Sequence, residues 1–413
     1  MKRRWPLVVL GVVAIAVAVL LVATAPRLDE PAEHLLREVT ALTSKEYPRP
    51  SHVDAPLPGS FGERAAAPLT ALSKVTPLMG AVDKEPVRCV DQAAKGQVFW
   101  PACQTLLDAA RDGARGVLEA TRAERGGVPI TLSAITSLTQ PTQASELYVA
   151  STTAVLEISR LQREGHLEEA LSWCLDAYAL ARDSSFGSGL LGHMLCVANT
   201  TRLLKVCPAV LQALSPPARA DALARIDRIY AGVPPLADTL LMEENAMGLV
   251  SHAQLLSDEQ RGRLPLVAQN AIRTFAPAGR LGYWFASLTS SEARELLRGW
   301  GPMQRYFHEA QEATRLPPAE RESRIVRARE ELERDLGSPS LLAPDLLKFT
   351  QRADRIGASQ ELLHEAVRLM DAPGDGWGAV SKDTFTLNKA ADGSATLTLA
   401  APAGELSIEL RPR

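Results

Sequence analysis

Glu243 is the residue whose type and position point most directly to chemistry. It falls in register with the apolar residues of one helical stripe, namely Leu236, Leu240, Met247 and Val250. A carboxyl on such a stripe has a raised pKa and can act as a general acid or base, with His193 or His252 as its partner in a hydrolase. The alternative is an ion pair with Arg202 or Arg228. This alternative is favoured because no nucleophile or second carboxylate is identifiable.

His193 and Cys196 lie three residues apart, which places both on one face of a helix. A His/Cys pair can activate a thiolate, although a hydrogen-bonded core histidine is the simpler interpretation. The sequence has no phosphate-binding loop, no His-Glu-x2-His zinc helix and no Gly-x-Ser-x-Gly nucleophile elbow. Its cysteines do not form the short-range pairs typical of structural zinc. We therefore expect neither a metal nor a cofactor.

Aromatic side chains gather between residues 283 and 307, which hold six of the chain's 20 aromatic residues: Tyr283, Trp284, Phe285, Trp300, Tyr306 and Phe307. Aromatic residues anchor interfaces and also fill cores. Gly282 and Gly301 nearby would leave room for a groove. The cluster is our candidate binding surface for a protein partner, with core filling as the commoner alternative.

The start of the chain predicts a membrane anchor. Residues 1–4 form a basic tail, and residues 5–25 are an uncharged run of 21 residues, long enough to cross a bilayer as a helix. Because the basic residues precede the span, we expect a cytoplasmic N-terminus and a periplasmic body, with the lipid bilayer as a partner. Cleavage of a signal peptide near Ala25 would instead give a secreted protein. Pro26 opposes cleavage because proline removes a backbone N–H beside the cut.

Export would place the five cysteines in an oxidising compartment, where disulfides form. Cys174 and Cys196 lie at similar distances from a turn near residue 184, so two antiparallel helices would bring them level and allow a bridge. Cys89 and Cys103 are the second expected pair, and their bridge would contribute about 3 kcal/mol. Cys207 is then left as a small apolar core residue.

Proline-rich residues 26–60 predict an extended stalk, and residues 61–375 predict a helical extracytoplasmic domain. Ser188 to Leu214 is apolar almost all round and predicts a central helix that Pro208 should bend. Further helices are expected at 217–231, 235–256, 263–275, 290–313, 317–335, 342–356 and 358–371.

The C-terminal residues 376–413 change to a period of two. Apolar residues alternate with polar ones in three runs between 383 and 411, with turn residues at Asp392-Gly393 and Ala403-Gly404. This pattern predicts a three-stranded antiparallel meander. Its apolar face must pack on the helices, because so small a sheet is marginally stable alone.

Residues 151–182 carry small and apolar residues at the spacing of a tetratricopeptide unit: Gly165, Ala170, Leu171 and Ala177. This stretch resembles one helical hairpin of that family. Positions one repeat away hold Thr131 and Asn199, so a tandem array is not supported. The overall plan also resembles uncharacterised bacterial membrane-anchored helical proteins, which implies a fold and no activity.

The charge balance excludes two broad classes. With 45 basic and 48 acidic residues the net charge is -3 and the pI about 6.2, which argues against wholesale disorder and against a nucleic-acid binder. The predicted fold is mainly α, an irregular helical-hairpin domain with a small C-terminal β-meander. We expect a protein-interaction or scaffolding module of the cell envelope rather than an enzyme. An envelope hydrolase using Glu243 and a nearby histidine is the alternative.

Overall fold

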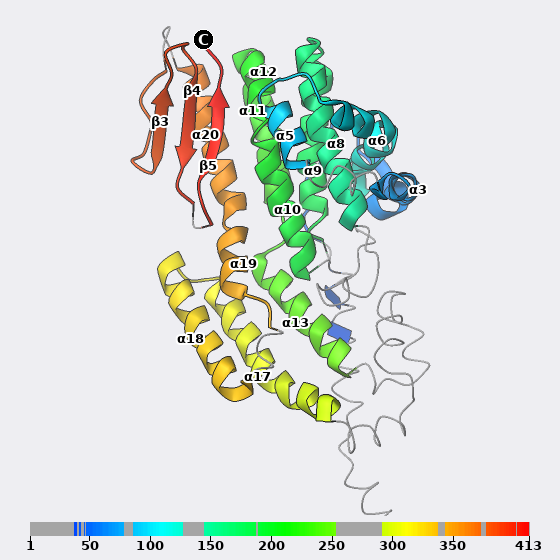
Figure 1. The fold of residues 1–413 in the computed structure, drawn as a ribbon, viewed down its shortest axis with the longest axis vertical. Helices are drawn as coiled ribbons and strands as arrows, with labels where there is room; N and C mark the ends of the chain where they lie inside the picture. The colour runs from blue at the N-terminus through cyan, green and yellow to red at the C-terminus, as the bar shows by residue number, and fades with distance from the viewer. Residues whose placement is uncertain are drawn as a thin grey trace, which may run out of the picture.

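The computed structural model describes residues 37–38, 41–42, 45, 47–77, 86–126, 144–186, 189–252, 291–337, 343–372, 377–401 and 403–412. Over these residues the chain is mainly helical and ends in a three-stranded antiparallel sheet, so the predicted fold class is confirmed at this level (Figure 1). The expected anchor, the expected helix at 263–275, and the candidates Tyr283, Trp284 and Phe285 lie outside the described residues. So does the side chain of His252, the last residue of its helix.

The first half of the body contains α3 (Phe61–Ser73), α5 (Pro86–Ala94), α6 (Pro101–Ala120), α8 (Ala144–Arg163) and α9 (Leu167–Asp183). Ser60 and Glu63 form a capping box that starts α3. The expected hairpin is present as α8 and α9, which reverse direction at Gly165, where φ is +82°. From Trp173 onward α9 is buried on all sides, so it lies at the centre of this half.

The expected helix from Ser188 to Leu214 is two helices, α10 (Gly189–Leu203) and α11 (Cys207–Ala213). Pro208 lies in the first turn of α11, where a missing N–H leaves no hydrogen bond unmade. The proline therefore starts a helix instead of bending one. In Figure 1, α10 runs through the middle of the molecule, and it packs against α8, α9, α13, α19 and α20.

The second half contains α12 (Pro216–Ala231), α13 (Leu236–His252), α17 (Ser291–Ala313), α18 (Pro318–Leu336), α19 (Leu346–Ala353) and α20 (Arg355–Asp371), close to the predicted ranges. Helices α17 and α18 form a hairpin at the lower end of Figure 1. A second hydrophobic core, with Phe307 and Ile325 fully buried, joins this hairpin to α13 and α19.

The C-terminal sheet has the predicted order β3 (Phe385–Lys389), β4 (Ala395–Leu399) and β5 (Leu406–Leu410). It packs on α20 and α11. Glu365 of α20 accepts hydrogen bonds from the Ser381 N–H and Oγ, each at 2.7 Å, and from the Arg368 guanidinium. Burial alone would raise the pKa of Glu365, but these donors outweigh it and lower that pKa to about 2. The charged carboxylate thus holds the start of the tail on α20.

Two disulfides cross the core, and one differs from expectation. Cys89 is joined to Cys103, with Cα atoms 5.7 Å apart, which links α5 to α6. Cys174 is joined to Cys207 and not to Cys196, which is buried and free. The expected Cys174–Cys196 pair was wrong because the chain breaks after α10, so that α11 returns to pack on α9.

Loss of the second bridge should be costly. Cys207→Ala opens a loop with a sequence separation of 33, and the chain-entropy model gives a loss of about 4 kcal/mol in the free energy of unfolding. Cys196→Ala, the matched control, should cost about 1 kcal/mol because it removes one buried sulfur atom. Urea unfolding measures both. Alkylation of the unreduced, denatured chain should label Cys196 alone, and labelling of Cys207 would contradict the assignment.

Candidate functional site

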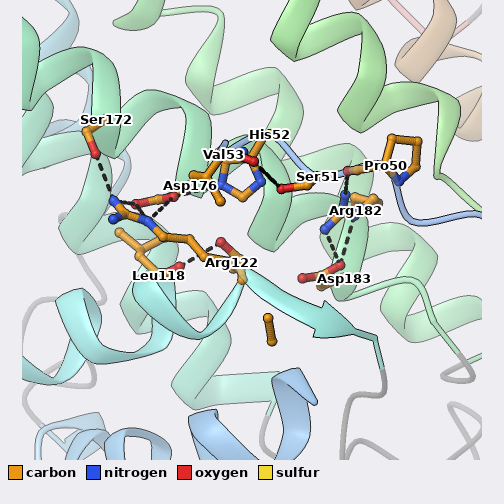
Figure 2. Close-up of polar contacts among 12 residues, drawn as sticks. Pro50, Ser51, His52, Val53, Leu118, Arg122, Ser172, Asp176, Arg182 and Asp183 are labelled. Carbon is orange, nitrogen blue, oxygen red and sulfur yellow. Dashed lines mark hydrogen bonds and ion pairs between the residues drawn. The ribbon is translucent and has the colours of Figure 1, made fainter. Parts of the chain in front are cut away.

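Residues 45 and 47–60, which we call the strap, are fastened to the body by polar contacts, and Figure 2 shows those around Pro50 and His52. Their C-terminal part, β1 (Leu57–Ser60), pairs in parallel with β2 (Ala123–Arg125). The sequence predicted these residues as part of an extended stalk. The structure shows them packed on α9 and on the turn after α6, because their polar side chains are partners of carboxylates on α9.

The first strap contact is a buried cluster of two arginines around Asp183. Arg49 donates to both Asp183 oxygens, at 3.1 and 2.6 Å, and Arg182 donates to Oδ1 at 2.8 Å. Arg182 also donates to the Pro50 carbonyl at 3.2 Å (Figure 2). Burial would raise the pKa of Asp183, but the Arg182 and Arg49 charges outweigh it and lower that pKa. Asp183 is therefore a charged, structural group.

The second strap contact joins His52 to Asp176. The His52 Nε2 lies 2.8 Å from Asp176 Oδ1, and Arg122 donates to the same carboxylate and, at 2.8 Å, to Ser172 Oγ (Figure 2). The residue types suggest a Ser-His-Asp hydrolase. However, Ser172 contacts Arg122 in place of His52, and His52 is 1% exposed. The imidazole contacts Asp176, whereas Ser172 is held by Arg122, so this cluster fastens the strap.

Neither cluster was predicted from the sequence, because the members of each come from distant segments. His52 and Asp176 are 124 residues apart, and Arg49 and Asp183 are 134 apart. One feature of the sequence pointed to them: Asp176 and Asp183 lie among the apolar residues of α9, where a carboxylate needs a partner. At its N-terminal end the strap contacts α13. The Lys45 Nζ and the Tyr47 hydroxyl lie 2.6 and 2.9 Å from Asp238 Oδ2.

The clusters predict that losing a buried ion pair lowers the free energy of unfolding far more than losing an exposed one. Asp183→Asn leaves the Arg182 and Arg49 charges without their carboxylate, and should lower the free energy of unfolding by about 3–5 kcal/mol. Glu119→Gln, which removes the exposed partner of Arg115, should change it by less than about 0.5 kcal/mol. Chemical denaturation measures both variants. Equal effects would contradict the fastening role.

The leading sequence candidate, Glu243, is 1% exposed and caps a helix. Its Oε2 accepts a hydrogen bond from the Leu190 N–H at 3.0 Å, at the N-terminus of α10. A carboxylate is stabilised there by the helix dipole and by the otherwise unpaired N–H groups. Arg202, one expected partner, stacks on the ring of Tyr148 at 4.1 Å. Glu243 therefore has a structural use.

His193 lies one turn further along α10 and is 3% exposed. Its Nδ1 is 3.5 Å from Thr239 Oγ1, and its ring packs on Phe349 at 5.6 Å between centroids. Burial lowers the pKa of His193 to about 4, so the imidazole is neutral at pH 7. Cys196, its expected partner in a thiolate pair, has a pKa raised by burial to about 12, which makes it a poor nucleophile.

His193 also lines a groove of about 620 Å³ where three helix joints meet, which we call the junction groove. The α12–α13, α17–α18 and α19–α20 joints supply its walls. The lining is partly apolar and partly charged, and consists of His193, Val233, Pro235, Leu236, Ala237, Thr314, Arg315, Arg321, Ala353, Asp354, Ile356 and Gly357. Arg321 is buried and paired with Asp354, with 3.0 Å from Nη1 to Oδ1. Arg315, in the turn after α17, is exposed and pairs with Glu312 of that helix.

The described aromatic candidates do not form a surface. Tyr306 and Phe307 are 2% and 0% exposed and fill the second core, where the Tyr306 hydroxyl donates to Pro344 O and accepts from Leu346 N. Trp300 is half-buried against α13, so close to Gly248 that a Cβ there would lie 2.3 Å from its ring. For Tyr306 and Phe307 the expected binding role is thus replaced by core filling.

Another groove, of about 650 Å³, runs along α17 and α18 and includes the ion pair of Arg324 with Glu309. None of its polar lining residues is buried. Within the described part of the chain, no three His, Cys, Asp or Glu side chains are grouped as metal ligands. The junction groove is therefore the stronger candidate, because a buried polar ring lines it.

Comparison of this chain with protein-family models, with curated proteins and with solved structures gives no match. The resemblance of the α8–α9 hairpin to a tetratricopeptide unit consequently has no support beyond the hairpin itself. Of the helices in the described ranges, none by itself has the length and apolar composition of a membrane span, whereas α10 and α11, bent by 43° at their joint, together do.

The buried imidazole predicts a specific loss of stability in acid. Between pH 6.5 and about 4 the unfolded chain binds a proton at His193 that the folded chain does not bind, so the free energy of unfolding falls with pH by up to about 3 kcal/mol. In His193→Gln this contribution is absent, and the difference between variant and wild type should shrink as the pH falls. Urea unfolding at pH 7, 5.5 and 4 measures it. A constant difference would contradict the assignment.

Proposed function

We propose that this chain is a membrane-anchored, extracytoplasmic helical module that binds a protein partner through the junction groove. The observation that carries the proposal is the lining of that groove, which combines apolar walls with a buried histidine and two arginines. Ligand sites are concave, mostly apolar and provided with a few placed polar groups, and their volumes range over roughly 300–1,000 Å³. The groove has this character.

The compartment part of the proposal rests on the cysteines and on the anchor predicted at residues 5–25. Four of the five cysteines form disulfides within the core. Such bonds persist in oxidising compartments and are rare in the cytosol. An extracytoplasmic body agrees with the predicted orientation, in which the basic residues 2–4 remain inside.

Binding is supported better than hydrolysis by what the candidate groups contact. Glu243 is engaged with the start of α10 and is absent from the lining of the junction groove. His52 of the strap and Asp176 of α9 are buried against each other. A hydrolase needs a base within reach of a nucleophile and of an open pocket, and His193 alone of these groups reaches a groove.

Two glycines provide a matched test. Gly357 lies in the groove and Gly301 lies on α17 away from it, and both are exposed helical positions with no atom within 4 Å of an added Cβ. Gly357→Trp should fill the groove without disturbing the fold, whereas Gly301→Trp adds the same side chain elsewhere. We expect affinity capture of the full chain from detergent-solubilised membranes to recover a specific partner with wild type and with Gly301→Trp, and at least tenfold less with Gly357→Trp.

Both variants should keep the melting temperature within about 3 °C of wild type, which separates a blocked groove from a damaged fold. Equal recovery with Gly357→Trp would contradict binding in this groove. Turnover of the captured protein by wild type, abolished in His193→Gln, would favour the hydrolase instead.

A further inference from the structure

The groups that line the junction groove suit a ligand that ends in a single negative charge. This inference rests on the proposed function and specifies the ligand. Of the charged lining residues, Arg321 and Asp354 are paired with each other, which leaves Arg315 as the uncompensated charge within the lining. Arg315 pairs with Glu312, but the two side chains are 74% and 36% exposed. Such an exposed pair is worth little, so the guanidinium is free to exchange its partner for a ligand.

The start of α13 adds donors to the same wall. Leu236 and Ala237, its first two residues, line the groove, and their N–H groups have no hydrogen-bond partner among the described residues. Helix N-termini of this length favour anions through these N–H groups and the helix dipole. Asp238 follows in the same turn, but it is held by Lys45 and Tyr47 of the strap and does not line the groove.

His193 provides an independent and buried polar group. Its Nδ1 is turned toward Thr239, so Nε2 lies on the opposite side of the ring, and no described residue hydrogen-bonds to it. The ring lines the groove although it is only 3% exposed. Buried polar groups normally have a hydrogen-bond partner, so a polar atom of a bound molecule can take this place at Nε2. Because the imidazole is neutral, it adds a hydrogen bond and no charge.

From this arrangement we infer that the junction groove binds the C-terminal carboxylate of a partner chain, next to an apolar side chain of that chain's last residues. The carboxylate interacts with Arg315 and the α13 N–H groups, and His193 Nε2 completes its hydrogen bonds. Val233, Pro235 and Ile356 provide the apolar surface. The lining carries one net positive charge, which matches a singly charged carboxylate.

The test uses the full chain in detergent and a library of random heptapeptides displayed with free C-termini. We expect selection to yield peptides that bind wild type and Gly301→Trp but not Gly357→Trp. The best peptide is then synthesised as the free acid and as the C-terminal amide, and its binding is measured by fluorescence polarisation. The acid should bind at least about tenfold more tightly than the amide, because charge-assisted hydrogen bonds are lost in the amide.

Arg315→Gln should reduce the preference for the acid to less than about threefold. Arg334→Gln is its matched control, since Arg334 is 72% exposed and also pairs with a glutamate three residues away, and it should leave the preference unchanged. Equal binding of acid and amide would overturn the carboxylate inference and leave the proposed function standing. If no selected peptide loses binding in Gly357→Trp, both the carboxylate inference and the proposed function are overturned. Displacement of the peptide by inorganic phosphate at lower concentration than by acetate would assign the site to a dianion instead.

Discussion

The fold depends on two carboxylates of α9 that are removed from water. Asp176 and Asp183 are 4% and 0% exposed, and a buried ionised carboxyl is destabilising by several kcal/mol unless cations and donors surround it. The body itself provides Arg122 and Arg182, and the strap provides His52 and Arg49. Neither carboxylate is fully compensated until the strap is in place. The strap is therefore part of the folded body, although its proline content alone suggests a spacer.

Helix α10 determines where the groove forms. Leu190, the second residue of α10, belongs to the second core, whereas Cys196 and Val197 belong to the first, so this one helix joins two separately packed cores. At the seam between the cores the chain turns three times, and the turn residues cannot fill the space as helices do. The junction groove lies at this seam, and His193, in the second turn of α10, is one of the buried residues that line it.

Periodicity alone was enough to predict most helices and the C-terminal meander, because a 3.6-residue or two-residue apolar pattern reflects burial directly. Periodicity did not predict the features that depend on where the chain reverses direction or which distant segments meet. The pairing of Cys174 with Cys207 depends on a break after Leu203 that an apolar sequence does not reveal, and the strap depends on contacts across more than 100 residues. Of the site candidates, His193 was identified from its position on an apolar helix. Arg315 and Arg321 were not, because the sequence does not show which distant helices bring them beside His193.

The strap and the junction groove are both formed against the first turn of α13. Asp238 is held by Lys45 and Tyr47, the residues just before it line the groove, and Thr239 just after it contacts His193. The first turn of a helix is the part most prone to fray, since its N–H groups have no intrahelical partner. Contacts on the strap side restrain this turn while its N–H groups stay available on the groove side. A wall held in this way loses little conformational entropy when a ligand binds, which is the physical basis of a preorganised site.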